Sequence, residues 1–249
     1  METLVLVVAG LFAGVLNAVA GGGTFLAFPA LVFAGVPPVA ANATATLAAM
    51  PGYIGSAWAY RHDLRAEGRL GLRAICAVAG IGAFAGAGLL LVTSDAVFTG
   101  VVPWLLLMAT FIFAAGPVVL TFTRKRGLAE AGPFLSAVVV LAVAIYGGYF
   151  NGGLGIMLLA AFGLIGYRDL HNMNGLKNGL SALLSLIASV TFVAAGMIAW
   201  QAAVPMAIST AVGGFIGAHY SRKIKNTKYL RMFIVAVGLV MSGLFFLPS

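Results

Sequence analysis

Nearly the whole chain consists of apolar runs long enough to cross a lipid bilayer. Of its 249 residues 62% are hydrophobic and 8% charged, whereas a soluble domain has about 25% charged residues. A helix needs about 20 apolar residues to cross the roughly 30 Å hydrocarbon core. Backbone polar groups in lipid must be satisfied within the chain, and these unbroken runs lack the alternation of barrel strands. The sequence therefore predicts an all-α polytopic membrane protein embedded in the lipid bilayer.

Charge and cysteine usage exclude other classes. The formal net charge of +8 would suit a nucleic-acid partner, but the basic residues form brief clusters between apolar runs and no continuous soluble face. The single cysteine, Cys76, lies in an apolar run and gives neither a disulfide framework nor metal-ligand spacing. We expect no nucleic acid, metal or cofactor. Residues 18–20 resemble a cleavage site, but the start lacks the basic residues of a signal peptide, so the segment is expected to stay.

Two of the eight apolar blocks are too long for one crossing. Blocks 3–36 and 133–166 each exceed 30 residues, and each is interrupted by glycines, at 21–23 and 152–155. Glycine favours a break or turn at such places. Each long block is therefore predicted to form two short helices, which either cross fully or fold into a re-entrant hairpin.

The basic residues favour this division. Thirteen of the fourteen lie in four connections, near 61–73, 124–126, 168 and 222–231, and lysine and arginine concentrate in short cytoplasmic loops. All four connections lie on the same side of the membrane only if each long block turns back at its glycines and so contributes an even number of crossings. We therefore predict that both termini lie outside the cytoplasm. The ten helical segments are 3–20, 23–36, 39–60, 70–93, 96–122, 133–150, 153–166, 172–197, 200–221 and 230–247.

Comparison of the chain with itself indicates an internal repeat. Glycines match at a spacing of 131, and a three-residue change of offset also aligns two asparagines: the pairs are Gly35/Gly166, Gly82/Gly213, Gly86/Gly217 and Asn17/Asn151. Residues 1–126 and 127–249 are thus predicted to be two repeats. Five segments per repeat is an odd number, which inverts the second copy in the membrane. Inverted repeats with interrupted helices indicate a transporter whose site lies near the midplane. The two GxxxG pairs are interpreted as helix-packing positions inside one subunit, in preference to a gate or the contact surface of a homodimer. A homodimer remains a possible partner state.

One basic residue, Lys177, lies outside the four clusters, about one and a half turns into segment 172–197. An intramembrane charge is costly and by default a candidate for function. Its long side chain could alternatively reach the cytoplasmic interface. The functional interpretation is favoured because Asn174, Asn178 and Ser181 share its helix face.

The repeat places Thr46 over Lys177 in another uncharged polar stretch. Helix N-termini at the glycine breaks would favour an anion, and no acidic residue lies within the predicted spans. His219, beside the last basic cluster, is a candidate for proton coupling, although an interfacial packing role is favoured. The predicted substrate-binding residues are Asn17, Gly21, Gly22, Gly23, Thr24, Asn42, Thr44, Thr46, Asn151, Gly153, Lys177 and Asn178.

These motifs resemble the TauE/SafE sulfite exporter family of small bacterial permeases. The resembling stretches are residues 18–31, 34–38, 43–44, Lys177 and 213–222. The resemblance implies a location in a bacterial inner membrane and export or uptake of sulfite, sulfonates or related small anions. This chain departs from the family pattern in two ways. Members often carry Asn-Lys where this chain has Ala45-Thr46, so only the second half contributes a lysine. The second glycine cluster, at residues 151–155, contains fewer consecutive glycines than the first.

The sequence thus predicts a secondary permease for small sulfur-containing anions, working by alternating access between the repeats. A passive anion channel or an uptake permease for another small organic anion is the alternative. An enzyme is disfavoured because HExxH, GxSxG and a carboxylate pair within the spans are missing. The substrate, direction, coupling ion and oligomeric state stay open.

Overall fold

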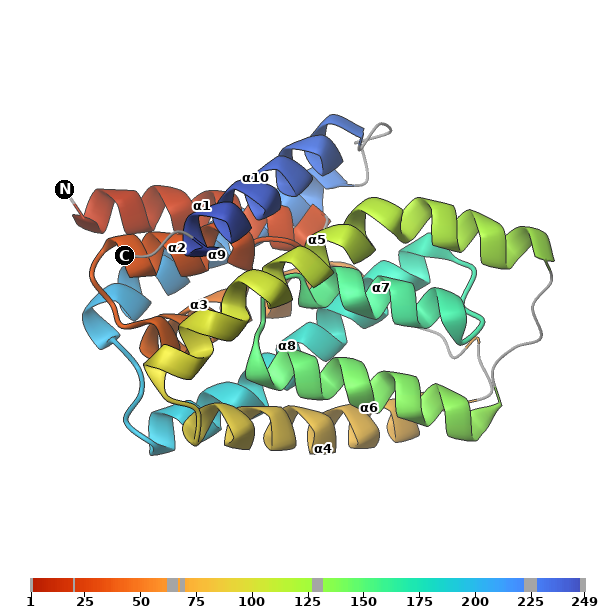
Figure 1. The fold of residues 1–249 in the computed structure, drawn as a ribbon. Helices are drawn as coiled ribbons and strands as arrows, with labels where there is room; N and C mark the ends of the chain where they lie inside the picture. The colour runs from red at the N-terminus through yellow and green to blue at the C-terminus, as the bar shows by residue number, and fades with distance from the viewer. Residues whose placement is uncertain are drawn as a thin grey trace.

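The computed structural model describes residues 2–19, 21–61, 67, 70–126, 132–221 and 228–246. Within these ranges the protein contains ten α-helices and no strand (Figure 1), which confirms the all-α prediction. The helices agree with the predicted segments to within about four residues. They are α1 Glu2–Val19, α2 Thr24–Phe33, α3 Pro38–Ala59, α4 Leu72–Leu91, α5 Asp95–Arg126, α6 Pro133–Tyr149, α7 Leu154–Leu164, α8 Leu170–Ala194, α9 Trp200–Ser221 and α10 Lys228–Phe246.

Helix length distinguishes the two members of each broken block. Helices α1, α4, α5, α8 and α9 each contain a stretch long and apolar enough to span a bilayer. In contrast, α2 has 10 residues and α7 has 11. At about 1.5 Å per residue each extends roughly 15–17 Å, about half of the hydrocarbon core. Each is therefore too short to cross the hydrocarbon core by itself, whereas α1, the first helix of its block, is long enough to do so.

Both short helices end at glycines that the sequence aligns with each other. Gly35 after α2 has φ 80° and Gly166 after α7 has φ 100°. The next N–H reaches back to the last turn in each case, from Val36 to the Leu31 carbonyl and from Tyr167 to the Phe162 carbonyl. This glycine-terminated geometry is a common end for a helix because only glycine adopts positive φ without strain.

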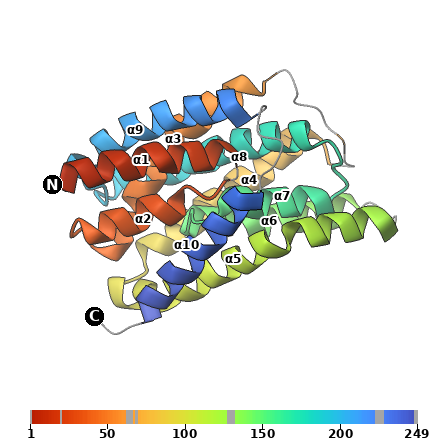
Figure 2. The ribbon, with the colours of Figure 1, turned by 90° about the horizontal axis from the view of Figure 1, so that it is seen from above.

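The helix ends are sorted between the two ends of the bundle. Figures 1 and 2 show the start of α1 and the end of α10 at one end, together with the connections α2–α3, α4–α5 and α8–α9. The end of α5 and the start of α6 lie at the opposite end, as do the connection between α7 and α8 and the end of α3. The basic residues near these helix ends, among them Arg61, Arg73 and Arg168, therefore lie opposite the termini.

Helices of the first half pack mainly against helices of the second half. Helix α1 packs against α9, and the corresponding pair α6 and α4 also pack together. Helix α3 likewise contacts α9 while α8 contacts α4, and α3 and α8 cross each other. The predicted repeat boundary falls at Arg126, the last residue of α5, and residues 127–131 lie outside the described part of the chain.

Glycines at the helix contacts confirm the interpretation of the GxxxG pairs as packing inside one subunit. A Cβ on Gly86 of α4 would lie 2.1 Å from the Ile145 carbonyl oxygen of α6. Similarly, a Cβ on Gly213 of α9 would lie 2.0 Å from the Leu11 carbonyl oxygen of α1. Only a missing side chain allows backbones to approach this closely.

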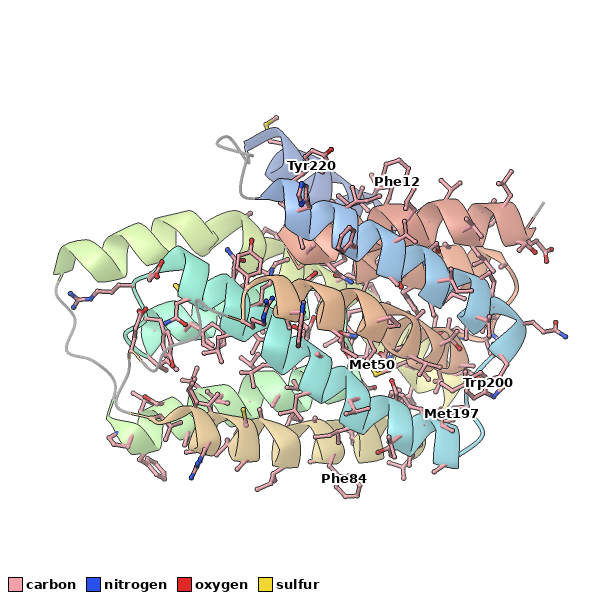
Figure 3. All side chains as sticks on the ribbon, turned by 180° about the vertical axis from the view of Figure 1, so that it is seen from behind. Phe12, Met50, Phe84, Met197, Trp200 and Tyr220 are labelled. Carbon is pink, nitrogen blue, oxygen red and sulfur yellow. The ribbon has the colours of Figure 1, made fainter. Side chains whose placement is uncertain are left out.

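Large apolar side chains cover the outside of the bundle, as expected for contact with lipid. Phe12 of α1 and Phe84 of α4 are 56% and 64% exposed and point outward on opposite sides of the molecule (Figure 3). Inside, toward the end that carries the termini, the fully buried rings of Phe28, Phe98 and Phe150 pack edge to face, with Phe28 5.9 Å from Phe150.

The glycine contacts predict a position-specific loss of stability. We expect Gly86→Ala to destabilise the protein by about 1–3 kcal/mol, the usual cost of overpacking, because the new Cβ would collide with the α6 backbone. Gly88→Ala, on the same helix, should be neutral since nothing lies within 4 Å of its Cβ position. Melting temperatures in detergent measure both, and equal effects of the two substitutions would contradict this packing.

The sidedness of the bundle predicts a labelling pattern. In a Cys76→Ser background, a cysteine at Glu2 and one at Phe246 should both react with a membrane-impermeant maleimide added from outside the cytoplasm, because these ends lie opposite the basic helix ends. A cysteine at Arg61 is the control and should react only after lysis. Labelling of just one terminus in intact cells would rule out the predicted topology.

Candidate functional site

The two glycine breaks meet inside the bundle. Gly21 follows α1 with φ 80°, and Gly153 precedes α7 with φ 73°. A Cβ on Gly21 would lie 2.7 Å from the Cα of Gly155, and a Cβ on Gly155 would lie equally close to the Cα of Gly21. The ends of four helices, α1, α2, α6 and α7, therefore come together here.

Lys177 of α8 reaches this meeting point and is completely buried. Its ammonium nitrogen donates a hydrogen bond to the Asn17 carbonyl, with 3.3 Å between Nζ and the oxygen. Its Cδ lies 3.2 Å from the place where a Cβ on Gly155 would stand, so glycine leaves room for the lysine stem. The structure thus places the side chain inside the protein, away from the interface that snorkelling would require.

The Asn17 backbone partly offsets this buried charge. Asn17 lies in the last turn of α1, where carbonyl groups lack intrahelical partners and the helix dipole is negative. Its side chain also supports the break, because the Gly23 N–H donates to Asn17 Oδ1 at 2.7 Å. Within the described part of the chain, no carboxylate pairs with the Lys177 ammonium.

The end of α6 has a matching arrangement made by α3. Asn42 Nδ2 donates to the Tyr149 carbonyl at 2.8 Å, as Lys177 does to Asn17. Thr46 donates to the Asn42 carbonyl at 2.9 Å. Beyond the break, Asn151 Nδ2 donates to Ser185 Oγ of α8 at 3.2 Å. Each broken helix end is therefore bound by a polar side chain from the other half of the chain.

A polar face of α8 beside Lys177 is buried without satisfied hydrogen bonds. Asn178 is fully buried, and neither its amide nitrogen nor its oxygen has a partner among the described residues. The same is true of Ser181 Oγ and Asn174 Oδ1. Residues 174, 177, 178 and 181 share one face by helical spacing. Buried polar atoms are normally paired, so these atoms indicate a place for water or a ligand.

Other predicted site residues lie in different surroundings. Thr24 is buried near the Tyr53 hydroxyl of α3. Thr44 accepts a hydrogen bond from the Ala199 N–H at the start of α9, 3.0 Å away, and so serves a helix end. His219 is exposed in the last turn of α9 beside Tyr220 and does not join the cluster. The residues with direct contacts around the breaks are Asn17, Gly21, Gly23, Gly153, Asn151, Asn42, Thr46 and Lys177, with Gly22 buried in the same turn and Asn178 next to Lys177.

Sequence reasoning missed several contributors. Ser185 lies eight residues after Lys177 and seven after Asn178, on the same helical face, so its spacing was a usable signal. Gly155 belonged to the recognised glycine break but not to the predicted site. Tyr53 and Tyr146, whose hydroxyl donates to the Gly152 carbonyl, gave no signal because their partners are set by the tertiary fold.

A carboxylate from the first half supports the helix that carries Lys177. Glu67, between α3 and α4, accepts hydrogen bonds from the Arg168 and Asp169 N–H groups at 2.7 and 3.2 Å and from Asn172 Nδ2 at 2.6 Å. These donors lie at the start of α8, where N–H groups lack intrahelical partners. Partial burial acts to raise the pKa of Glu67, but the three donors outweigh it and the pKa is lowered.

A multi-pass helical bundle in which two broken helix pairs meet at a buried lysine is an arrangement typical of membrane transport proteins. A model of the family described as "Sulfite exporter TauE/SafE" matches residues 6–245. The chain therefore belongs to this family, as its motifs predicted.

Several similar proteins carry transporter names. The chain is 28% identical over 238 residues to a "Probable membrane transporter protein" of Haemophilus influenzae, covering 94% of this chain and 90% of the relative. It is 28% identical over 242 residues to the "Probable membrane transporter protein YfcA" of Escherichia coli K12, covering 96% and 87%. A Sinorhizobium "Probable membrane transporter protein ORF9" is 25% identical over 246 residues, covering 95% and 89%. No solved structure matches the chain significantly.

The Glu67 contacts predict how stability depends on pH. A lowered pKa in the folded protein contributes stability that is complete above the ordinary carboxyl range and is lost as pH falls through the folded pKa. We expect Glu67→Gln to lower the free energy of unfolding at neutral pH by about 1 kcal/mol, as for a lost helix cap, and therefore to lower the melting temperature. The difference from wild type should shrink in acid. Glu2→Gln at the exposed start of α1 is the control. A difference that stays constant down to acidic pH would contradict this role.

Proposed function

We propose that this protein is a secondary transporter for small sulfur-containing anions such as sulfite or organosulfonates. The observation that carries the proposal is Lys177, which is fully buried, has no carboxylate partner among the described residues and lies at the point where the two broken helix pairs meet. Membership of a family described by sulfite export supports the substrate class.

The electrostatics of this point favour an anion. Leaving a charge buried without a counter-charge is costly, and a bound anion would supply one. The N-termini of α2 and α7 at the breaks favour negative charge, but the C-termini of α1 and α6 at the same point oppose them, so Lys177 is the main group that would attract an anion. The unpartnered amide and hydroxyl groups of Asn178 and Ser181 could complete the hydrogen bonds of an oxyanion.

The cross-half contacts support alternating access over a static pore. Lys177 of the second half binds the broken helix of the first half, and Asn42 of the first half binds the broken helix of the second. An anion that attracts the ammonium competes with the Asn17 carbonyl and so weakens a contact between the halves. Ligand binding would then favour rearrangement of the predicted inverted repeats, because a ligand shifts a conformational equilibrium through differential affinity.

The role of Lys177 predicts a transport defect in proteoliposomes. Lys177→Gln should reduce the initial rate of sulfite flux by at least about tenfold, because one charged hydrogen bond is worth more than the 1.4 kcal/mol that this factor represents. Ser189→Ala is the matched control, a buried polar position on the same helix three turns away, and should transport normally.

The assay separates the proposal from its alternatives. Melting temperatures should show that Lys177→Gln is folded, and a folded variant that moves sulfite at the wild-type rate would remove the lysine from the site. Unlabelled sulfite on the far side should accelerate flux of labelled sulfite through an alternating carrier. A passive channel would show no such acceleration, and flux of a different organic anion in place of sulfite would favour the other permease.

A further inference from the structure

The buried polar residues contain a single charged side chain. Across the described ranges, the buried polar set consists of asparagine, threonine and serine residues together with Lys177. The basic residues whose exposure the structure describes at the bundle ends, Arg61, Arg73 and Arg168, are exposed. The interior of the described protein therefore offers at most one positive charge to a ligand.

The helix ends at the breaks do not add a second positive charge. Two helix N-termini, those of α2 and α7, meet at the glycine breaks, but so do the C-termini of α1 and α6. Each N-terminus corresponds to about half a positive charge and each C-terminus to about half a negative charge. The four contributions oppose one another, so Lys177 remains the source of net charge.

The neutral groups also limit the negative charge that the site can take. The orientation of the Asn42 amide is fixed, because its nitrogen donates to the Tyr149 carbonyl, and its unpartnered oxygen can only accept. Asn17 Oδ1 is likewise an acceptor, bound to the Gly23 N–H. These two amide oxygens, one at each break, are acceptors, and acceptors near a bound anion disfavour further negative charge.

We propose that the site selects anions with one negative charge and rejects doubly charged anions of the same shape. This inference rests on the proposed transport function and specifies its substrate class. A singly charged oxyanion and the protonated lysine form a neutral pair, whereas a dianion leaves one uncompensated charge in the interior, which is strongly unfavourable. Sulfite would accordingly be carried in its singly charged form, hydrogensulfite. Alkyl sulfonates already carry one negative charge and would be carried without a change of protonation.

The decisive comparison uses two tetrahedral sulfur oxyanions whose charges do not change near neutral pH. Methanesulfonate has one negative charge and sulfate has two. The purified wild-type protein is tested with each at equal ionic strength, by thermal shift for binding and by competition with labelled sulfite in proteoliposomes. We expect methanesulfonate to bind and compete at least about tenfold more strongly than sulfate.

Two variants test the charge count directly. Thr46→Lys adds a cation at the buried position that the repeat aligns with Lys177, and should improve sulfate relative to methanesulfonate. Lys177→Gln should lose methanesulfonate binding without gaining sulfate. Because Thr46→Lys can fail to fold, size-exclusion chromatography checks it first, and the wild-type comparison decides the proposal by itself.

The outcomes separate the two levels of the argument. Sulfate that binds and competes as well as methanesulfonate would overturn the charge selection while leaving anion transport intact. If sulfite, methanesulfonate and sulfate all neither bind nor move, the proposed function fails and takes the charge selection with it. A preference for methanesulfonate that Thr46→Lys reverses would support the single-charge site.

Discussion

The structure depends on how a helix can end inside a membrane. Lipid offers no partner for a free carbonyl or N–H group, so a break is tolerated only where protein groups satisfy the exposed backbone. Here the end of α1 receives a hydrogen bond from Lys177, and the end of α6 receives one from Asn42. Both donors come from the other half of the chain. The same contacts that make the breaks possible therefore join the two halves, and the polar groups needed for a binding site collect at the place where the backbone requires them.

Glycine makes this arrangement possible in two distinct ways. At Gly21 and Gly153 it supplies the positive φ that reverses or restarts a helix. At Gly86 and Gly213 the backbone is ordinary helix, and the missing side chain lets α4 approach α6 and α9 approach α1. The short helices α2 and α7 are largely enclosed by the long helices, since about half of their residues are buried.

Much of this fold could be predicted because its causes are local. Apolar run length gave the ten helices, and glycine clusters gave the breaks, while the count of basic connections required the chain to turn back at both. Parity could not choose between full crossings and re-entrant hairpins, and the structure adds that Gly35 and Gly166 end α2 and α7 after 10 and 11 residues. At the site, Lys177 and its polar face were visible as residues that lipid excludes. Thr44 could not be separated by residue type from the side chains at the breaks, because helix contacts distant in sequence decide which side chains point inward. For the same reason, nothing in the sequence linked Glu67 to the start of α8.

The lysine has two roles that compete for the same atom. Without a ligand, Nζ binds a backbone carbonyl of the opposite half and helps to close the α1 break. With an anion present, the stronger charge-assisted interaction draws the ammonium away from that carbonyl. A purely structural lysine would be better replaced by a neutral donor, as α6 shows, where Asn42 performs the same task without the cost of burying a charge. The chain thus contains its own comparison, with one broken helix end bound by an amide and the other by a lysine. The proposed anionic substrate would account for this difference, because it would supply the counter-charge that the lysine lacks.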